Sequence, residues 1–163
     1  MKTFMIADTH FGDKNIMDFE QRPFKTVEEM NETIIKYWNN TVSPEDTVYL
    51  IGDVGDVSIV KHLNGHKFLI KGNHDTKSNN FYRMNGFEEV YDKPIIIDNF
   101  YILSHEPIYV NETMPYANIF GHVHKNPIYK TVSKRGYCVS LERINYTPKN
   151  FYEIKKEIIE LNN

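Results

Sequence analysis

The chain contains one cysteine, Cys138, so it cannot form an internal disulfide, which fits a reducing compartment. No apolar run approaches the ~20 residues of a membrane-spanning helix, and Asp8 ends the first apolar stretch too early for a signal peptide. The sequence has no basic run, and its formal net charge of −3 argues against a protein that coats nucleic acid through its overall field. We therefore expect a cytoplasmic protein with no membrane partner.

The composition is that of an ordinary globular protein. The chain has 163 residues, of which 40% are hydrophobic and 25% are charged. This length suits one domain with a substantial core, and no repeat, low-complexity tract or linker divides the sequence. We expect a single domain over residues 1–163.

Short apolar runs alternate with helical patterns along the chain, which predicts a layered α/β domain. Apolar residues spaced for one face predict a helix over Thr26–Asn40, with Thr26 as its N-cap. A second helix is expected over Pro148–Leu161, where Thr147 would be the N-cap and a proline would take the first helical position. A short helix is expected near Val57–Leu63. The expected strands are Lys2–Ala7, Thr47–Ile51, Lys67–Lys71, Phe87–Val90, Ile95–Asp98, Tyr101–Ser104, Asn118–Phe120, Ile128–Val132 and Tyr137–Leu141.

Five short polar clusters each follow an apolar run, and they contain five of the seven histidines. In chain order they are Asp8-Thr9-His10, Gly52-Asp53, Gly72-Asn73-His74-Asp75, Ser104-His105 and Gly121-His122-Val123-His124. Ligands gather outside the carboxyl ends of strands in open α/β sheets, so side chains from these loops can meet at one place. A glycine before three of the clusters lets the backbone turn sharply and approach a bound ion. Asp75 is expected to anchor its own loop by hydrogen bonds.

The clusters supply two carboxylates, one amide and four imidazoles as candidate metal ligands. They are Asp8, His10, Asp53, Asn73, His105, His122 and His124. This mixed set suits Mn²⁺, Fe or Zn²⁺ better than Mg²⁺ or Ca²⁺, which prefer oxygen ligands. Two divalent ions would bring four positive charges against two carboxylates, so the loaded site would attract an anion. Because paired metals clamp a phosphoryl group and acidify a shared water, phosphate ester hydrolysis is the expected chemistry.

These five clusters, which span residues 8 to 124, resemble the motif set of the calcineurin-like metallophosphoesterases. The first part of the chain, through Gly52-Asp53, is similar to a small prokaryotic and phage branch of that superfamily. The resemblance implies a four-layer αββα sandwich with a two-metal site at one end. It also implies one metal held by Asp8, His10, Asp53 and His124, and another held by Asp53, Asn73, His105 and His122. Among the metals that suit this donor set, we expect Mn²⁺ first.

The resemblance assigns further roles around the metals. In the family, the histidine that corresponds to His74 protonates the leaving-group oxygen or steadies the scissile phosphate without binding metal. Many members carry an aspartate at the position of Asp56 that orients this histidine; the alternative for Asp56 is to cap the short helix that follows. Larger phosphatases continue this motif with a phosphate-binding arginine, whereas Val57 follows here. Arg22 is our candidate replacement, with Asn15 as a helper, against the alternative that Arg22 is only solvated.

The function implied is a two-metal phosphoesterase in which a hydroxide bridging the metals attacks phosphorus and His74 assists the leaving group. The short chain leaves little room for a capping domain over a small monoester, so a phosphodiester is favoured over a monoester. A nucleotide or nucleic acid is the narrower substrate class. The alternative is a catalytically silent scaffold that keeps the same fold to bind partners. Such a scaffold would be expected to have lost site residues, whereas every ligand position is filled here.

Overall fold

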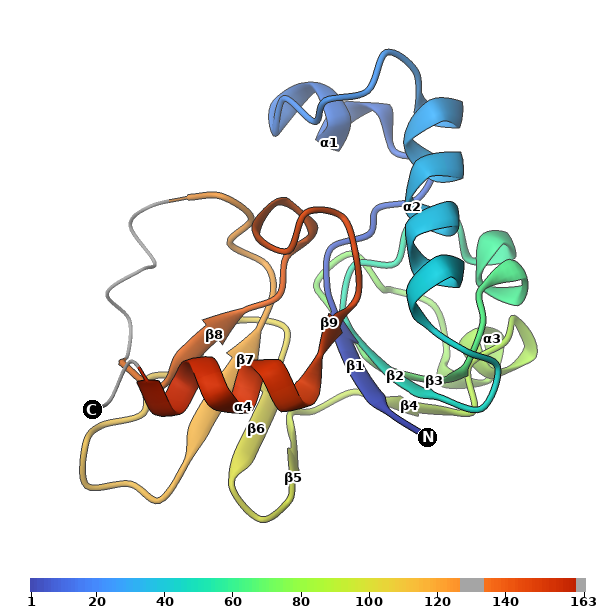
Figure 1. Ribbon diagram of the computed structural model, residues 1–163. Helices are drawn as coiled ribbons and strands as arrows, with labels where there is room; N and C mark the ends of the chain where they lie inside the picture. The colour runs from blue at the N-terminus through green and yellow to red at the C-terminus, as the bar shows by residue number, and fades with distance from the viewer. Residues whose placement is uncertain (127–133, 161–163) are drawn as a thin grey trace.

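A computed structural model describes residues 1–126 and 134–160, which form a mixed α/β domain with two β-sheets (Figure 1). The first sheet has the strand order β4-β3-β2-β1-β9. Its strands are β1 (Thr3–Ile6), β2 (Thr47–Ile51), β3 (His66–Ile70), β4 (Glu89–Tyr91) and β9 (Lys149–Asn150). The first four are parallel, and β9 pairs antiparallel with β1. The carboxyl ends of the four parallel strands therefore lie at one edge of the sheet.

The second sheet repeats this arrangement on a smaller scale, with the strand order β5-β6-β7-β8. Its strands are β5 (Ile95–Ile97), β6 (Tyr101–Ser104), β7 (Ala117–Phe120) and β8 (Gly136–Cys138). Strands β6, β7 and β8 are parallel, and β5 pairs antiparallel with β6 across a tight turn. The two central residues of that turn, Asp98 and Asn99, have positive φ values of 50° and 54°, which suits the residue types found there.

The two sheets are joined where β1 ends. Ala7 pairs with Ser140 in a parallel bridge, its N–H donates to the Val139 carbonyl at 2.9 Å, and its carbonyl accepts from Leu141 at 3.2 Å. The segment that follows β8 thus lies against the segment that follows β1. The carboxyl ends of the parallel strands of both sheets consequently converge on one region.

Four α-helices and two short 3₁₀ helices complete the described structure. They are α1 (Lys14–Phe19), α2 (Val27–Thr41), η1 (Val57–His62), α3 (Asn79–Met84), η3 (Leu141–Arg143) and α4 (Phe151–Glu160). Helix α2 lies beside the first sheet, whereas α4 contacts β1, β9 and β8 and so spans both sheets (Figure 1). Met30, Ile34 and Trp38 form the buried stripe of α2, as its apolar spacing predicts. Within the described residues, no helix has the length and apolar character required to cross a membrane.

Local sequence signals predict most of these elements. Thr26 caps α2 as expected, because its hydroxyl accepts from the N–H of Glu29 at 3.1 Å. Strands β2 and β6 have the predicted bounds. The expected strand over Tyr137–Leu141 ends earlier, at Cys138, and the one over Ile128–Val132 falls outside the described residues.

The predicted start of the last helix is wrong. Thr147 is not its N-cap and Pro148 is not its first residue, because α4 begins at Phe151. The intervening residues are extended: Asn150 pairs with Phe4 and Lys149 with Met5 at the edge of the first sheet. Pairing to an open strand edge satisfies backbone groups that an earlier helix turn would leave to solvent, so tertiary contact overrides the local helix signal.

Candidate metal centre

The structure brings all seven predicted ligands to the edge where the strands of both sheets end. Asp8 and His10 follow β1, Asp53 follows β2 and Asn73 follows β3. From the second sheet, His105 follows β6, and His122 and His124 follow β7. Residues more than a hundred positions apart in sequence therefore share one site, and they fall into two adjacent groups.

The first group consists of Asp8, His10 and His124, whose ligand atoms all lie within 4.8 Å of one another. All three residues are buried. Both Asp8 oxygens accept from the backbone N–H of His122, at 3.1 and 2.9 Å, which fixes the carboxylate. The Nε2 atom of His10 is buried without a hydrogen-bond partner among the described residues. An orphaned ring nitrogen beside a carboxylate is an arrangement that a bound cation would satisfy.

The second group consists of Asp53, His105 and His122, with ligand atoms again within 4.8 Å of one another. Asn73 adds its side-chain oxygen, which lies 3.0 Å from His105 Nε2 and 3.1 Å from His122 Nδ1. The two ring nitrogens are 3.2 Å apart. His105 Nδ1 lies 3.0 Å from the Ile51 carbonyl and donates to it, so Nε2 is the nitrogen directed into the group.

Asp53 stands between the two groups. Its Oδ2 lies 3.5 Å from Nε2 of His10 in the first group and 3.3 Å from Nε2 of His105 in the second. Its Oδ1 accepts from the backbone N–H of His74 at 2.9 Å, so the carboxylate is held in place. One carboxylate oxygen facing both groups is the placement that a bridging ligand requires.

The donor set and its spacing fit a pair of divalent cations. Cation–ligand distances of ~2.0–2.1 Å place neighbouring ligand atoms ~3.0–3.4 Å apart. The contacts within the second group span 3.0 to 3.3 Å. Nitrogens and oxygens that both offer lone pairs repel at such distances unless a proton or a cation lies between them.

The pKa values of the metal-free site also indicate a site that binds cations. Burial alone would lower the pKa of His105, but the hydrogen bond and charge of Asp53, together with the charge of Asp8, raise it to about 9. The protonated ring therefore supplies positive charge where the carboxylates need it. Burial raises the pKa of Asp8 to about 6 and lowers that of His10 to about 4. His10 is thus neutral at pH 7 and its ring nitrogen is available as a ligand.

Strained backbone is concentrated at the site. Five of the seven predicted ligands have φ between 45° and 67°, a left-handed conformation that costs about 1–2 kcal/mol for a residue with a side chain. They are Asp8, His10, Asp53, His122 and His124. The preceding glycines permit close approach: a Cβ on Gly52 would lie 2.2 Å from His105 Nδ1, and one on Gly72 2.2 Å from Asp53 Oδ1. Strain of this kind persists where surrounding contacts fix the geometry of a functional site.

Asp75 provides many of the contacts that fix the backbone of the site. Its carboxylate accepts from the backbone N–H groups of Asp53 at 2.7 Å, Val54 at 3.1 Å and Gly72 at 2.8 Å. The loops after β2 and β3 are therefore tied to one buried side chain. This confirms the expectation that Asp75 anchors its own loop, and it extends the anchoring to the Asp53 loop.

Glu142 is a site residue that lies outside the five polar clusters of the sequence. Its carboxylate oxygens each lie 3.1 Å from Nδ1 of His124, and Oε1 also accepts from Arg22 Nε at 2.9 Å. Burial alone would raise the pKa of Glu142, but the hydrogen bond from His124 and the charge of Arg22 lower it to about 2. Its position in the sequence could have indicated this role, because Glu142 follows β8 just as the predicted ligands follow the other parallel strands.

Arg22 is placed differently from our expectation of a phosphate contact. Its guanidinium is buried and donates to the backbone carbonyls of Asp8 at 2.7 Å and Thr9 at 3.0 Å, as well as to Glu142. Because its donors are used in these hydrogen bonds, Arg22 stabilises the loop that carries Asp8 and His10. Asn15 is exposed on α1 and lines neither of the two hollows beside the site.

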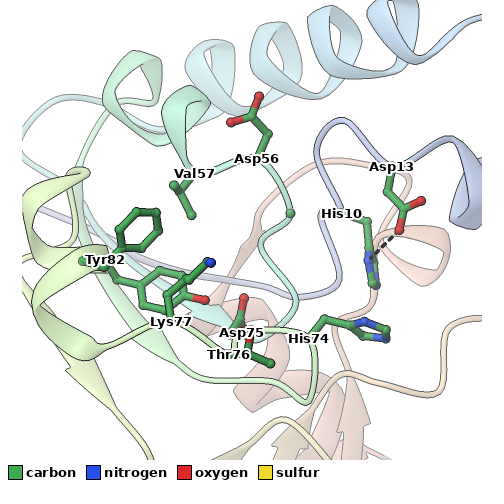
Figure 2. A pocket seen from close by; sticks show the side chains of 11 residues that line it. His10, Asp13, Asp56, Val57, His74, Asp75, Thr76, Lys77 and Tyr82 are labelled. Carbon is green, nitrogen blue, oxygen red and sulfur yellow. Dashed lines mark ion pairs between the residues drawn. The ribbon is translucent and has the colours of Figure 1, made fainter.

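Two hollows flank the ligand groups. One of about 320 Å³ is lined by His10, His74 and Asp56, among others (Figure 2). His74 is exposed at its edge, with its ring 5.5 Å from that of His10 in a T-shaped contact. Asp56 caps η1 through the N–H of Ser58, which confirms the capping alternative. The other hollow, of about 280 Å³, lies beside Asn73 and His105.

The comparisons with known proteins identify relatives of this chain. It is 34% identical to the uncharacterized protein MJ1445 of Methanocaldococcus jannaschii over 173 residues, which cover 96% of this chain and 91% of that protein. The chain belongs to the same family as MJ1445. No protein-family model matches the chain.

Two further proteins resemble this member of the family. The gene 66 protein of Mycobacterium phage L5 is 33% identical over 82 residues, which are 45% of this chain and 39% of the phage protein. The crystal structure of the protein of unknown function AQ665 from Aquifex aeolicus is similar with a TM-score of 0.71 and 27% identity, covering 95% of this chain and 98% of that one. Nearly the whole described architecture thus recurs in a solved structure.

Proposed function

We propose that this protein is a two-metal phosphoesterase of the calcineurin-like type. The observation that carries the proposal is the position of Asp53, whose Oδ2 faces His10 on one side and His105 on the other. A pair of ligand groups sharing one carboxylate is the arrangement used by hydrolases that act on phosphate esters through two cations. The two mixed sheets and their helices support the four-layer αββα sandwich that this class implies.

In this proposal each ligand group holds one divalent cation, with Mn²⁺ first and Fe or Zn²⁺ as alternatives. Asp8, His10 and His124 hold one ion, the Asn73, His105 and His122 side chains hold the other, and Asp53 is shared. Bound there, the two cations would polarise the phosphoryl oxygens and acidify a water molecule, which supplies hydroxide at neutral pH. The mixture of imidazole, amide and carboxylate ligands supports these metals over Ca²⁺ or Mg²⁺.

His74 is the residue proposed to give a proton to the leaving-group oxygen. Its ring is exposed beside the ligand groups and packs edge-on against His10, while its backbone N–H is fixed by Asp53. A histidine that is tethered through its main chain but solvent-exposed at its ring can reach a substrate and exchange its proton with water. The ring therefore assists departure of the alcohol without acting as a ligand.

The open shape of the site supports a phosphodiester over a monoester. One hollow lies beside His74 and the other beside His105, so the ligand groups sit between two spaces. A diester has an organic group on each side of its phosphorus and can fill both. A monoester has only one such group and would leave one hollow to water.

Hydrolysis of bis(p-nitrophenyl) phosphate and of p-nitrophenyl phosphate tests the proposal. Each is assayed with the chelated protein and after addition of Mn²⁺, Zn²⁺ or Fe²⁺. We expect Mn²⁺ to give turnover, chelator to abolish it, and the diester to be the better substrate. If neither ester is hydrolysed with any of these metals, the enzyme proposal fails and the silent scaffold becomes the better account. A preference for the monoester would overturn only the diester assignment.

A further inference from the structure

The hollow beside His74 has a chemistry of its own. It extends from His10 and His74 to Asp56, Lys77 and Tyr82 (Figure 2), and at about 320 Å³ it is large enough for a small organic group. In the proposed reaction His74 protonates the departing oxygen. The group attached to that oxygen must then lie on the His74 side of the site, which is where this hollow is.

The charged side chains that line this hollow differ in whether their charged atoms have hydrogen-bond partners. Asp75 accepts from three backbone N–H groups, while Asp13 caps α1 and Asp56 caps η1. Lys77 differs, since its ammonium has no hydrogen-bond or ion-pair partner among the residues that the structure describes, and its side chain is directed into the hollow (Figure 2). Lys77 is therefore a cation of this hollow without a partner in the described part of the chain, and an anionic group of a ligand can pair with it.

The remaining wall suits a flat ring. Phe81 lines the hollow, and 37% of its surface is exposed. Its ring packs edge-on against Tyr82 at 5.6 Å, which holds it in position. A fixed and accessible aromatic ring offers a stacking surface for a planar group. The free carboxylate oxygen of Asp56, whose Oδ1 serves the η1 cap, can accept from a hydroxyl.

We propose that this hollow binds the leaving group of the ester and selects a nucleotide. The base lies on Phe81, a sugar hydroxyl donates to Asp56, and the phosphate that the leaving nucleotide itself carries pairs with Lys77. The substrate is then a nucleotide diester with at least one further phosphate on the leaving side. This assignment rests on the proposed function, because the leaving side is defined by His74.

Binding without turnover provides the first test. Adenosine, adenosine 5′-monophosphate and adenosine 3′-monophosphate are titrated by calorimetry into the chelated, metal-free protein. At least one monophosphate should bind about fivefold more tightly than adenosine, which is the upper end of what an accessible ion pair contributes. Lys77→Ala should remove that difference, and Phe81→Ala should weaken adenosine and the monophosphates alike. Lys36→Ala, on the outer face of α2, is the matched control and should bind all three like the parent.

Turnover provides the second test. The adenylyl dinucleoside monophosphate ApA is compared with pApA and ApAp, which carry one more phosphate at either end. With Mn²⁺, one of the phosphorylated forms should show a kcat/KM about fivefold above that of ApA, and Lys77→Ala should erase this ratio. Equal binding of adenosine and both monophosphates by the parent, or a ratio that survives Lys77→Ala, overturns the inference. If the parent still hydrolyses bis(p-nitrophenyl) phosphate while either of these results is obtained, only the nucleotide inference fails and the proposed function is retained.

Discussion

The carboxylate of Glu142 lies 3.1 Å from Nδ1 of His124, and the same carboxylate accepts from the buried guanidinium of Arg22 at 2.9 Å. A hydrogen bond at Nδ1 leaves Nε2 as the ring nitrogen available to a cation. Carboxylates that orient a ligating histidine in this way raise its basicity and fix its tautomer. Glu142 and Arg22 are thus proposed to position His124 without touching a substrate.

Replacing Glu142 should loosen the first ligand group. Glu142→Gln leaves Arg22 buried without its counter-charge, so we expect a loss of about 3 kcal/mol in the free energy of unfolding. Affinity for metal should fall about 10- to 100-fold because the His124 ring is no longer fixed. Both are measured on purified protein, by urea unfolding and by Mn²⁺ titration. Glu153→Gln, on the exposed face of α4, is the control. Parent-like affinity in Glu142→Gln would show that the ring needs no such support.

The pKa of His105 predicts how the stability of the metal-free protein depends on pH. Because folding raises this pKa from 6.5 to about 9, the stabilisation is fully present below pH 6.5 and is lost as pH rises through 9. The loss should be on the order of 3 kcal/mol in the free energy of unfolding between pH 6 and pH 10. Metal-loaded protein should lack this dependence, since ligation removes the proton. His105→Gln should flatten the profile of the metal-free protein. A profile unchanged by His105→Gln would assign the dependence to other groups.

Asp53 and Asp56 allow a matched comparison of two aspartates three residues apart. Asp53→Asn should reduce metal affinity at least tenfold at both ligand groups and abolish turnover, because the shared carboxylate loses its charge. Asp56→Asn should keep its metal and its stability, since asparagine caps a helix as well as aspartate does. Metal content is read by elemental analysis after dialysis. Equal metal content in the two variants would contradict the shared role of Asp53.

His74 separates catalysis from metal binding. His74→Ala should lower kcat about 10²- to 10⁴-fold, which is the usual effect of losing a positioned acid, and should leave metal content unchanged. His62→Ala, an exposed histidine on η1 outside the clusters, should turn over like the parent. Turnover of His74→Ala at the parent rate would remove His74 from the reaction.

Two glycines with positive φ distinguish backbone strain from crowding. Gly86 has φ +110°, and a Cβ there would meet its nearest neighbours at 3.4 to 3.6 Å, which is ordinary van der Waals contact, so Gly86→Ala should cost about 1–2 kcal/mol of stability through its backbone alone. Gly52 has φ +83° and a Cβ there would meet His105 Nδ1 at 2.2 Å. Gly52→Ala should therefore lose metal as well as stability, as measured by thermal melting with and without Mn²⁺. A Gly52→Ala variant that binds Mn²⁺ like Gly86→Ala would show that the ring can shift freely.

The sequence could identify the candidate ligands because each one lies within four residues of the end of a strand. Apolar runs such as Thr47–Ile51 and Tyr101–Ser104 form strands from their own composition, and the residue after a run must lie at the strand end. The same local reasoning placed Thr26 at the start of α2. The site follows because parallel strands end at a shared edge, a rule that needs no knowledge of packing.

Only the tertiary structure determined which charges meet across the site and where the last helix begins. Arg22 and Glu142 are 120 residues apart, and no local pattern records that they pair. Lys149 and Asn150 extend because the open edge of β1 offers them hydrogen bonds, against the helix signal of their neighbours. Short-range propensity and motif spacing lie within the sequence itself. The partners of buried charges and open strand edges depend on distant segments, which come together only when the chain folds.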